Sequence, residues 1–238
     1  MAPRVNTFSP TWHTTFSANR DEAETTREVA FLARVLPQPP ARVLDVPCGF
    51  GRHARGLAAL GHAVTGVELD ERVIGEAIRR SRGAIEYVEG DMRDLSALRH
   101  DFDGVICMWA SFGYFGHETN VAVLRGMAER LRPGGRLVLD VYNPDFMETR
   151  QGLFERGPVA ETKTISEGRL RVELSYHGGP VEDVFEWELY RPEQLDELAR
   201  TCGLERELVC SGFDEAVAPS SEVPRLQLVY ERSARASV

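Results

Sequence analysis

The sequence has almost no lysine, few cysteines and no long hydrophobic run. Lys163 is the only lysine among 238 residues, so mechanisms that use a lysine nucleophile have one candidate, which lies in a polar stretch with nothing to activate it. The longest uninterrupted apolar run, residues 105–110, is far shorter than a membrane span, and the N-terminus shows no basic and apolar leader. We therefore expect a cytoplasmic protein that does not enter a membrane.

The cysteines and the charge balance exclude further classes of protein. The four cysteines, Cys48, Cys107, Cys202 and Cys210, show no paired metal-ligand spacing, so we expect reduced thiols and no bound metal. Lys plus Arg comes to 28 and Asp plus Glu to 37, a formal net charge of -9, which repels phosphate backbones and argues against a nucleic acid partner. With 42% hydrophobic and 27% charged residues, the composition is that of one globular domain with room for an inserted lobe.

A proline-rich segment, residues 37–40, separates an N-terminal arm from the rest of the chain. Apolar residues at helical spacing before it predict that the arm ends in an amphipathic helix. After it, strands are predicted over residues 42–46, 64–69, 85–88, 102–108 and 136–142. Helices are predicted after the first, second and fourth of these strands. This order is typical of a parallel sheet covered by helices on both faces.

The alternation of strands and helices changes after residue 150. Residues 152–190 follow a period of two with a turn at 178–180, which predicts an antiparallel ribbon inserted into the α/β order. A last helix begins at Pro192 and stops at Gly203, and residues 204–210 and 225–230 predict an antiparallel hairpin at the sheet edge. The predicted parts are an arm and helix (1–36), a core (37–150), a β lid (151–190) and a closing helix and hairpin (191–238).

The segment after the first predicted strand has the composition of a ligand-binding turn. It begins at Asp45 and contains Gly49 and Gly51, which let a ligand approach the backbone at a helix N-terminus. Taken alone, the pattern also fits the dinucleotide fingerprint, or a tight turn that binds nothing. Asp45 would face a pyrophosphate unfavourably, but it suits a cationic ligand.

Acidic residues also stand at the ends of the second and third predicted strands. Glu68 is placed to accept hydrogen bonds from both hydroxyls of a ribose. Asp91 can accept from the exocyclic amine of a purine, and Met92 supplies a soft side chain that packs on the ring. Taken alone, Glu68 is also compatible with a solvated acid at a strand end, and Met92 with a core side chain. Together with Asp45 they describe a ligand with a ribose, an amino-purine and positive charge, which S-adenosyl-L-methionine fits.

With these motifs the sequence resembles the class I S-adenosylmethionine-dependent methyltransferases, over residues 41–142 and again in the closing helix and hairpin. The resemblance implies an α/β fold with a doubly wound, mostly parallel seven-stranded sheet, the Rossmann-like methyltransferase fold, here with an antiparallel β insertion. Many family members have glycine where this chain has Pro47, and because Gly49 and Gly51 remain we expect a stiffer turn that still binds. The cofactor contacts that it implies are Asp45, Pro47, Gly49, Gly51, Glu68, Leu69, Asp91, Met92, Met108 and Ser111.

The aromatic segment after the fourth predicted strand, residues 108–115, faces the methyl donor and the acceptor in this family. The resemblance therefore implies Trp109 and Tyr114 as acceptor-binding residues, together with Asn143 after the fifth strand. If the acceptor must lose a proton, His117 is the preferred catalytic base and Tyr142 the alternative. Alternatively, His117 has no catalytic role and is simply an exposed residue at the start of a helix.

The function predicted is methyl transfer from S-adenosyl-L-methionine to a small-molecule acceptor, at nitrogen or oxygen. The position of the lid resembles that in methyltransferases of sugar amines and other natural-product intermediates. Two alternatives remain: an NAD-dependent oxidoreductase, which has no use for Asp45, and a catalytically silent cofactor-binding subunit. The aromatic residues of the arm either close over the donor or anchor the arm to the core. The oligomeric state stays open, with a homodimer among the options.

Overall fold

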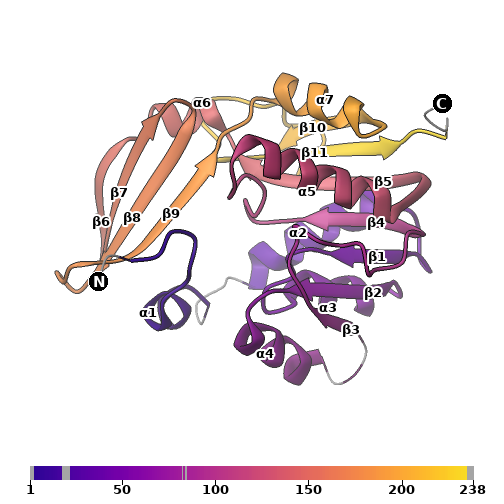
Figure 1. Cartoon of the computed structure of the whole chain (residues 1–238), viewed down its shortest axis with the longest axis horizontal. Helices are drawn as coiled ribbons and strands as arrows, with labels where there is room; N and C mark the ends of the chain where they lie inside the picture. Colours follow the sequence, from indigo (N-terminus) through magenta and orange to yellow (C-terminus); the bar gives the residue numbers. More distant parts are fainter. Residues whose placement is uncertain (1–2, 18–21, 82, 84, 235–238) are drawn as a thin grey trace.

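Two β-sheets form the framework of the protein (Figure 1). The computed structural model describes residues 3–17, 22–81, 83 and 85–234. The larger sheet has seven strands, and a four-stranded sheet lies beyond one end of it. The outermost residues of the predicted arm and closing segment, 1–2 and 235–238, lie outside the described residues, as do residues 18–21 within the arm.

The seven-stranded sheet is mostly parallel, which confirms the predicted fold class. Its strand order is β10-β11-β5-β4-β1-β2-β3, with β1 to β5 parallel to their neighbours in this group. Strand β11 is antiparallel to β5 and β10 is antiparallel to β11, so the closing hairpin forms the edge that its short connection predicts. The strands are β1 (Arg42–Asp45), β2 (Ala63–Glu68), β3 (Glu86–Glu89), β4 (Phe102–Cys107), β5 (Leu131–Tyr142), β10 (Leu204–Ser211) and β11 (Arg225–Arg232).

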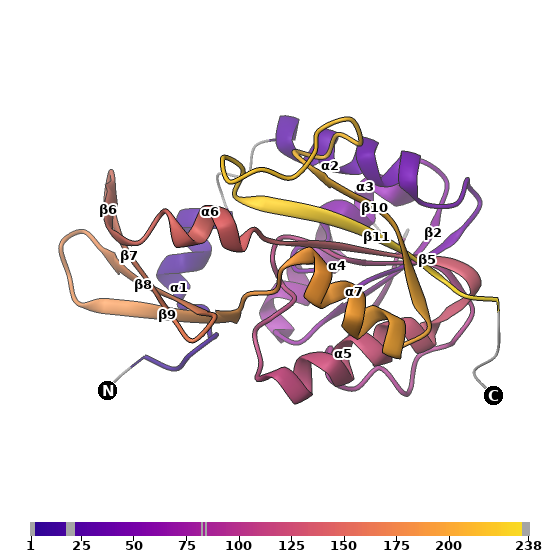
Figure 2. The same cartoon turned by 90° about the horizontal axis from the view of Figure 1, so that it is seen from above.

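Helices cover both faces of this sheet (Figure 2). Helices α2 (Glu22–Val35) and α3 (Arg52–Ala59) pack on one face, and α5 (His117–Arg130) and α7 (Pro192–Thr201) pack on the other. Helix α4 (Glu71–Ser81) packs on β2 and β3. None of the described helices is long and apolar enough to cross a membrane.

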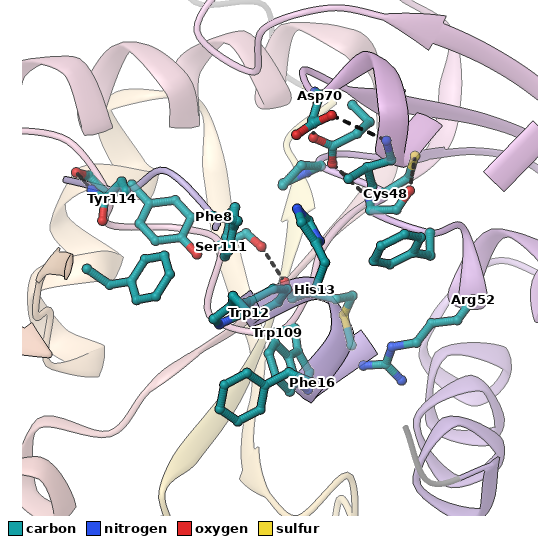
Figure 3. Close-up of a pocket in the computed structure, with 18 of the residues that line it drawn as sticks. Phe8, Trp12, His13, Phe16, Cys48, Arg52, Asp70, Trp109, Ser111 and Tyr114 are labelled. Atoms are coloured by element: carbon teal, nitrogen blue, oxygen red, sulfur yellow. Dashed lines mark hydrogen bonds between the residues drawn. The ribbon is translucent and has the colours of Figure 1, made fainter. Parts of the chain in front are cut away.

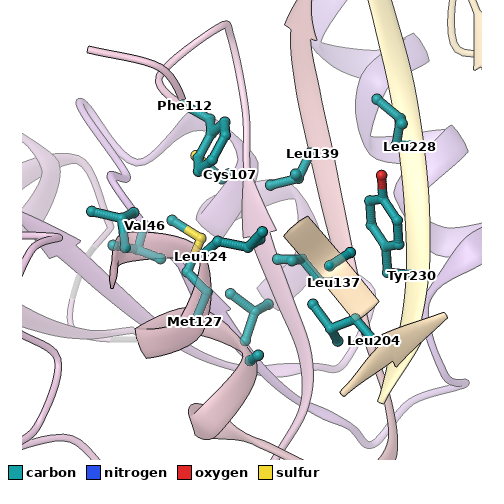
Figure 4. Close-up of a cluster of buried hydrophobic side chains, with 14 of the residues drawn as sticks. Val46, Cys107, Phe112, Leu124, Met127, Leu137, Leu139, Leu204, Leu228 and Tyr230 are labelled. Atoms are coloured by element: carbon teal, nitrogen blue, oxygen red, sulfur yellow. The ribbon is translucent and has the colours of Figure 1, made fainter. Parts of the chain in front are cut away.

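The hydrophobic core explains why the central strands have uninterrupted apolar runs. Leu137, Val138 and Leu139 of β5 are completely buried, because side chains on both sides of the strand meet a helix. Figure 4 shows Leu124 and Met127 of α5 against this strand, on the face that also holds Leu204 and Tyr230.

Strand β5 starts earlier than predicted. The strand was predicted over residues 136–142, yet Pro133, Gly134 and Gly135 already lie inside β5. The helix ends at Arg130, and Leu131 already pairs with Phe102 of β4. A register shift between Phe102 and Gly104 takes up the extra residues.

The predicted antiparallel insertion is confirmed, but it is a sheet of four strands and not a ribbon. Its strands are β6 (Gly152–Arg156), β7 (Val159–Ser166), β8 (Arg169–Tyr176) and β9 (Val181–Glu188). The alternation of β8 is clear, because Leu170, Val172, Leu174 and Tyr176 are buried on one face. Strands β6 and β7 contain no buried residue, so they lack the strict alternation on which the prediction depended.

The N-terminal arm lies against the four-stranded sheet. It contains α1 (Pro10–Trp12) and a π-helical turn, η1 (His13–Ser17). Val5 forms a parallel bridge with Val184 of β9, and the Asn6 side chain exchanges hydrogen bonds with the backbone of Glu186 and donates to Tyr114 O. The short helix α6 (Pro144–Glu148) connects β5 to the inserted sheet.

Candidate functional site

A cavity of ≈ 1220 Å³ opens at the carboxyl ends of β1, β2, β3 and β4, as the strand-end motifs predict. The arm and the inner face of the inserted sheet enclose its other sides. Figure 3 shows Trp12, His13 and Phe16 of the arm among the residues that line the cavity, together with Cys48, Asp70, Ser111 and Tyr114. Most of the predicted site residues line the cavity, namely Pro47, Gly49, Glu68, Leu69, Asp91, Met92, Met108, Trp109, Ser111, Tyr114 and Tyr142.

Glu68 ties the glycine-rich turn to the end of β2. Its Oε2 accepts from Gly49 N at 3.0 Å, and its Oε1 accepts from Leu69 N at 2.9 Å and Asp70 N at 3.0 Å. Burial raises the pKa of Glu68, and these three N–H groups oppose the rise without cancelling it. Oε1 already accepts two hydrogen bonds, whereas Oε2 accepts one and keeps a free lone-pair direction, so the acid can still accept a hydrogen bond from a ligand.

Gly51 shapes the turn from outside the cavity wall. It was expected to contact the cofactor, but among the described residues it is not part of the lining. Its φ is +70°, and a Cβ at this position would collide with the hydroxyl of Tyr87. Glycine is therefore required here for packing as well as for the left-handed backbone.

Asp45 is also absent from the lining, although it directly precedes the turn. Its side chain is completely buried, and neither carboxylate oxygen has a hydrogen bond of good geometry to a described residue. Burial raises the pKa of Asp45 to about 8, while the Arg52 charge and the Ala54 N–H lower it by less. A buried acid with open acceptors beside the glycine turn fits a cationic group.

Asp91 lies at the cavity with an arginine partner that the sequence reasoning missed. Arg93 donates to both carboxylate oxygens, with Nε 3.0 Å from Oδ1 and 2.9 Å from Oδ2, and its guanidinium covers the Phe115 ring at 5.1 Å. These hydrogen bonds lower the pKa of Asp91. Phe115 packs against the core and also lines the cavity.

The cavity wall on the side of the inserted sheet is aromatic. Trp187 of β9 stands at its centre, with ring centroids 5.3 Å from Tyr114, 5.0 Å from Tyr142 and 5.9 Å from Phe185. Phe8 of the arm packs on Phe185 at 5.0 Å. The alternation of β8 and β9 predicted strands here, but no sequence signal distinguished the face that would line a site.

Two predicted site residues lie elsewhere. His117 is the first residue of α5, its side chain is 57% exposed, and Nδ1 lies 3.4 Å from Glu188 Oε1, outside the cavity. Asn143 faces away from the cavity: its Oδ1 accepts from Asp145 N, and its Nδ2 donates to Ser220 O and Val223 O. It caps α6 and holds a neighbouring loop, which uses the amide fully.

Known proteins share both the sequence pattern and the fold. A family model described as "Methyltransferase domain" matches residues 43–135. The dTDP-3-amino-3,6-dideoxy-alpha-D-glucopyranose N,N-dimethyltransferase of Streptomyces fradiae is 30% identical over 203 residues, which cover 78% of each chain. The CcbJ methyltransferase of Streptomyces caelestis is similar in structure, with a TM-score of 0.79 at 20% identity over 93% of this chain and 96% of CcbJ. The amino pentose methyltransferase CalS10 of Micromonospora echinaspora, bound to S-adenosylmethionine, has a TM-score of 0.71 at 22% identity over 97% and 100% of the two chains.

Proposed function

The chain belongs to the class I S-adenosylmethionine-dependent methyltransferases, and from this premise we propose that it methylates the amino group of an amino sugar carried on a nucleoside diphosphate. The observation that carries the proposal is the 30% identity to a dTDP-amino-sugar N,N-dimethyltransferase over 78% of both chains. Because the chain belongs to this family, the alternative of an NAD-dependent oxidoreductase is rejected. S-adenosyl-L-methionine supplies a methyl group activated by its sulfonium.

The donor side of the cavity supports this function through three acids. Asp45 lies behind the cavity lining, and we propose that its buried carboxyl group, whose acceptor positions are open, attracts the ammonium group. Glu68 lines the cavity and offers the remaining lone pair of Oε2 to the ribose. Asp91 and Met92 lie at the end of β3, where we propose that they hold the adenine. Gly49 has a φ of +52°, and nothing lies within 4 Å of the place that a Cβ would take, which leaves room for a ligand against the backbone there.

The acceptor side is supported by the aromatic wall. Trp187, Tyr114 and Tyr142 present large rigid faces to the cavity, which suit a sugar ring and, once it is alkylated, an ammonium group. Lys163 and Glu161 of β7 also line the cavity and pair at 3.1 Å. We propose that residues 151–190 act as the acceptor-selecting lid and that the net charge of -9 keeps nucleic acid away.

An amine acceptor removes the need for a base on the protein. The neutral amine attacks the methyl carbon with its lone pair, the C–S bond breaks, and the proton leaves the product ammonium afterwards. What the protein contributes is alignment and exclusion of water. This chemistry is compatible with a His117 that lies outside the cavity, and we propose that Tyr142 orients the acceptor.

The test is a transfer assay with matched acceptors. The purified protein is incubated with S-adenosyl-L-methionine and a dTDP-3-amino sugar, or the same sugar with a hydroxyl in place of the amine. We expect mass spectrometry to detect one or two added methyl groups on the amino sugar only. Transfer to neither sugar, or preferential transfer to the hydroxyl, would overturn the proposal.

A further inference from the structure

The turn that follows β4 is held in a conformation that its residues do not favour. Trp109 and Ala110 have φ values of +63° and +54°, in the left-handed region that L side chains rarely adopt. Two such residues in succession persist only where the surroundings fix them. Trp109 lines the cavity, so this backbone sets where its ring stands.

Three hydrogen bonds from two different parts of the fold clamp this turn. Trp109 N donates to Asp140 Oδ2 at 2.9 Å, and Ala110 N donates to the backbone carbonyl of Asp140, also at 2.9 Å. From the inserted sheet, Trp187 Nε1 donates to Ala110 O at 2.7 Å. The turn is therefore the point at which the aromatic wall is joined to the core.

Asp140 is in turn held by side chains of β11. Gln227 Nε2 donates to its Oδ1 at 2.8 Å, and Arg225 Nη1 donates to its Oδ2. The Arg225 guanidinium also covers the Trp109 ring at 5.7 Å. Asp140 and Gln227 are buried, and the Arg225 side chain is 16% exposed, so water competes little for these contacts.

The same arginine connects the turn to the donor side of the cavity. Arg225 Nη2 donates to Glu28 Oε1 at 3.3 Å, and the other oxygen of Glu28 accepts from Arg52 and from His53. Arg52 and His53 begin α3 directly after the glycine-rich turn, and both line the cavity. One buried network thus reaches both halves of the site.

We propose that Asp140 and Arg225 are positioning residues. They hold the Trp109–Ala110 turn so that the core and the aromatic residues around Trp187 form one acceptor-binding surface of fixed geometry. Neither residue needs to touch a reactant for this role. The inference about acceptor kinetics rests on the proposed function, while the inference about the turn does not.

The first experiment measures the turn without any activity. Asp140→Asn leaves one acceptor oxygen where three side-chain and backbone donors now meet, so we expect the Trp109 N–H bond or its neighbours to be lost. The three tryptophans, Trp12, Trp109 and Trp187, give three indole signals in ¹⁵N-labelled protein, assigned with Trp12→Phe and Trp187→Phe. We expect hydrogen exchange at Trp187 Nε1 to quicken at least tenfold in Asp140→Asn, and an unchanged rate would overturn the proposal.

The second experiment measures transfer in folded variants. Asp140→Asn, Arg225→Lys and Trp187→Phe should each lower kcat about 10- to 100-fold and raise the acceptor KM, because small misplacements of a reactant cost this much. The affinity for S-adenosyl-L-methionine should stay within about threefold. The matched control is Tyr230→Phe, in the same strand as Arg225. It removes a hydroxyl that donates to Asp196 at 3.1 Å, and its kcat and acceptor KM should equal those of the wild type.

The outcomes separate the two proposals. If the wild type transfers no methyl group to an amino sugar, the proposed function fails, and the indole exchange still decides the positioning role. If the wild type is active and Asp140→Asn and Arg225→Lys both keep its kcat and acceptor KM, the positioning role is overturned. The same holds if donor affinity falls as far as kcat in all three variants, since the network would then serve donor binding alone.

Discussion

At the scale of single residues, three carboxyl groups at the strand ends beside the cavity have sharply different surroundings. Asp45 is buried with open acceptors, Glu68 accepts from three backbone N–H groups, and Asp91 is paired with an arginine. All three follow or end a parallel strand, yet only the three-dimensional neighbours decide which one keeps its proton. The pKa of Asp45 is raised to about 8, whereas the pKa of Asp91 is lowered.

Asp45 should make the stability of the ligand-free protein depend on pH. Its folded pKa of about 8 lies above the unfolded value of 3.8, so folding favours the protonated acid. The free energy of unfolding should therefore fall between about pH 4 and pH 8, by up to about 1.4 kcal/mol per pH unit from this group. Urea denaturation across this range should show the fall in the wild type and its absence in Asp45→Asn.

The same acid should link donor binding to pH in the opposite direction. Binding of the cationic ligand favours the ionised carboxylate, so affinity for S-adenosyl-L-methionine should rise between about pH 6 and pH 8. Asp45→Asn should bind more weakly and lose this dependence. Calorimetry that shows parallel pH profiles for both proteins would remove Asp45 from the donor site.

Glu68 should contribute to donor affinity both directly and through the turn. In Glu68→Gln one acceptor oxygen becomes an amide NH2 group. This group then faces the backbone N–H of either Gly49 or Leu69, and the hydrogen bond at that position is lost. We expect a loss of about 1.5 to 3 kcal/mol in binding free energy, roughly 10- to 150-fold in Kd. Glu89→Gln, an exposed acid at the end of β3, is the control and should bind as the wild type does.

At the scale of elements, the arm and the inserted sheet behave as one unit. The carboxylate of Asp183 in β9 is buried and accepts from Ser9 N at 2.7 Å, from Ser9 Oγ at 2.8 Å and from Tyr176 OH at 2.7 Å. Because the arm also lines the cavity, the inserted sheet positions residues that are remote in sequence. A deletion through this sheet would therefore disturb the arm as well as the acceptor side.

Asp183→Asn should loosen the arm selectively. The amide can accept at only one oxygen, so at least one of the bonds to Ser9 is lost, at a cost of roughly 1 to 3 kcal/mol. Hydrogen exchange at residues 6–12 should quicken, with little change in β5. Tyr176→Phe, which removes a single donor, should have a smaller effect; equal exchange in Asp183→Asn and the wild type would contradict the anchoring role.

At the scale of the whole molecule, the two sheets line opposite sides of the cavity, and we propose that the Rossmann-like sheet binds the donor and the added sheet most of the acceptor. The seven-stranded sheet ends in loops that carry acids and glycines, and the four-stranded sheet presents aromatic and aliphatic side chains. A ligand that fills this cavity contacts both parts. Binding should therefore stabilise the folded protein as a whole.

S-adenosyl-L-methionine should raise the melting temperature and NADH should not. At a concentration of about 100 Kd a ligand that binds only the folded state adds about 2.7 kcal/mol, which corresponds to roughly 5 to 10 °C for a chain of this size. Thermal unfolding with each compound at equal concentration measures this difference. An equal shift with NADH would show that the cavity does not discriminate the two ligands.

The sequence by itself determined the class of the fold and the place of the cavity at the carboxyl ends of the parallel strands. Strand and helix periods, the Gly49 turn and the strand-end acids Glu68 and Asp91 are local features, and parallel strands bring their carboxyl ends together by topology alone. For the same reason the closing hairpin could be predicted from the short connection between its strands.

Only the tertiary structure decided the acceptor half and the orientation of individual side chains. The Trp187 wall faces the cavity because β9 packs against the arm and the Ala110 turn, contacts between residues far apart in the chain. His117 and Asn143 have suitable chemistry in the right segments. The position of His117 at the start of α5 directs its side chain to solvent, and the Asn143 amide is engaged in capping α6 and in holding a neighbouring loop. Residue type fixes what a side chain can do, while packing over long sequence separations fixes what it faces.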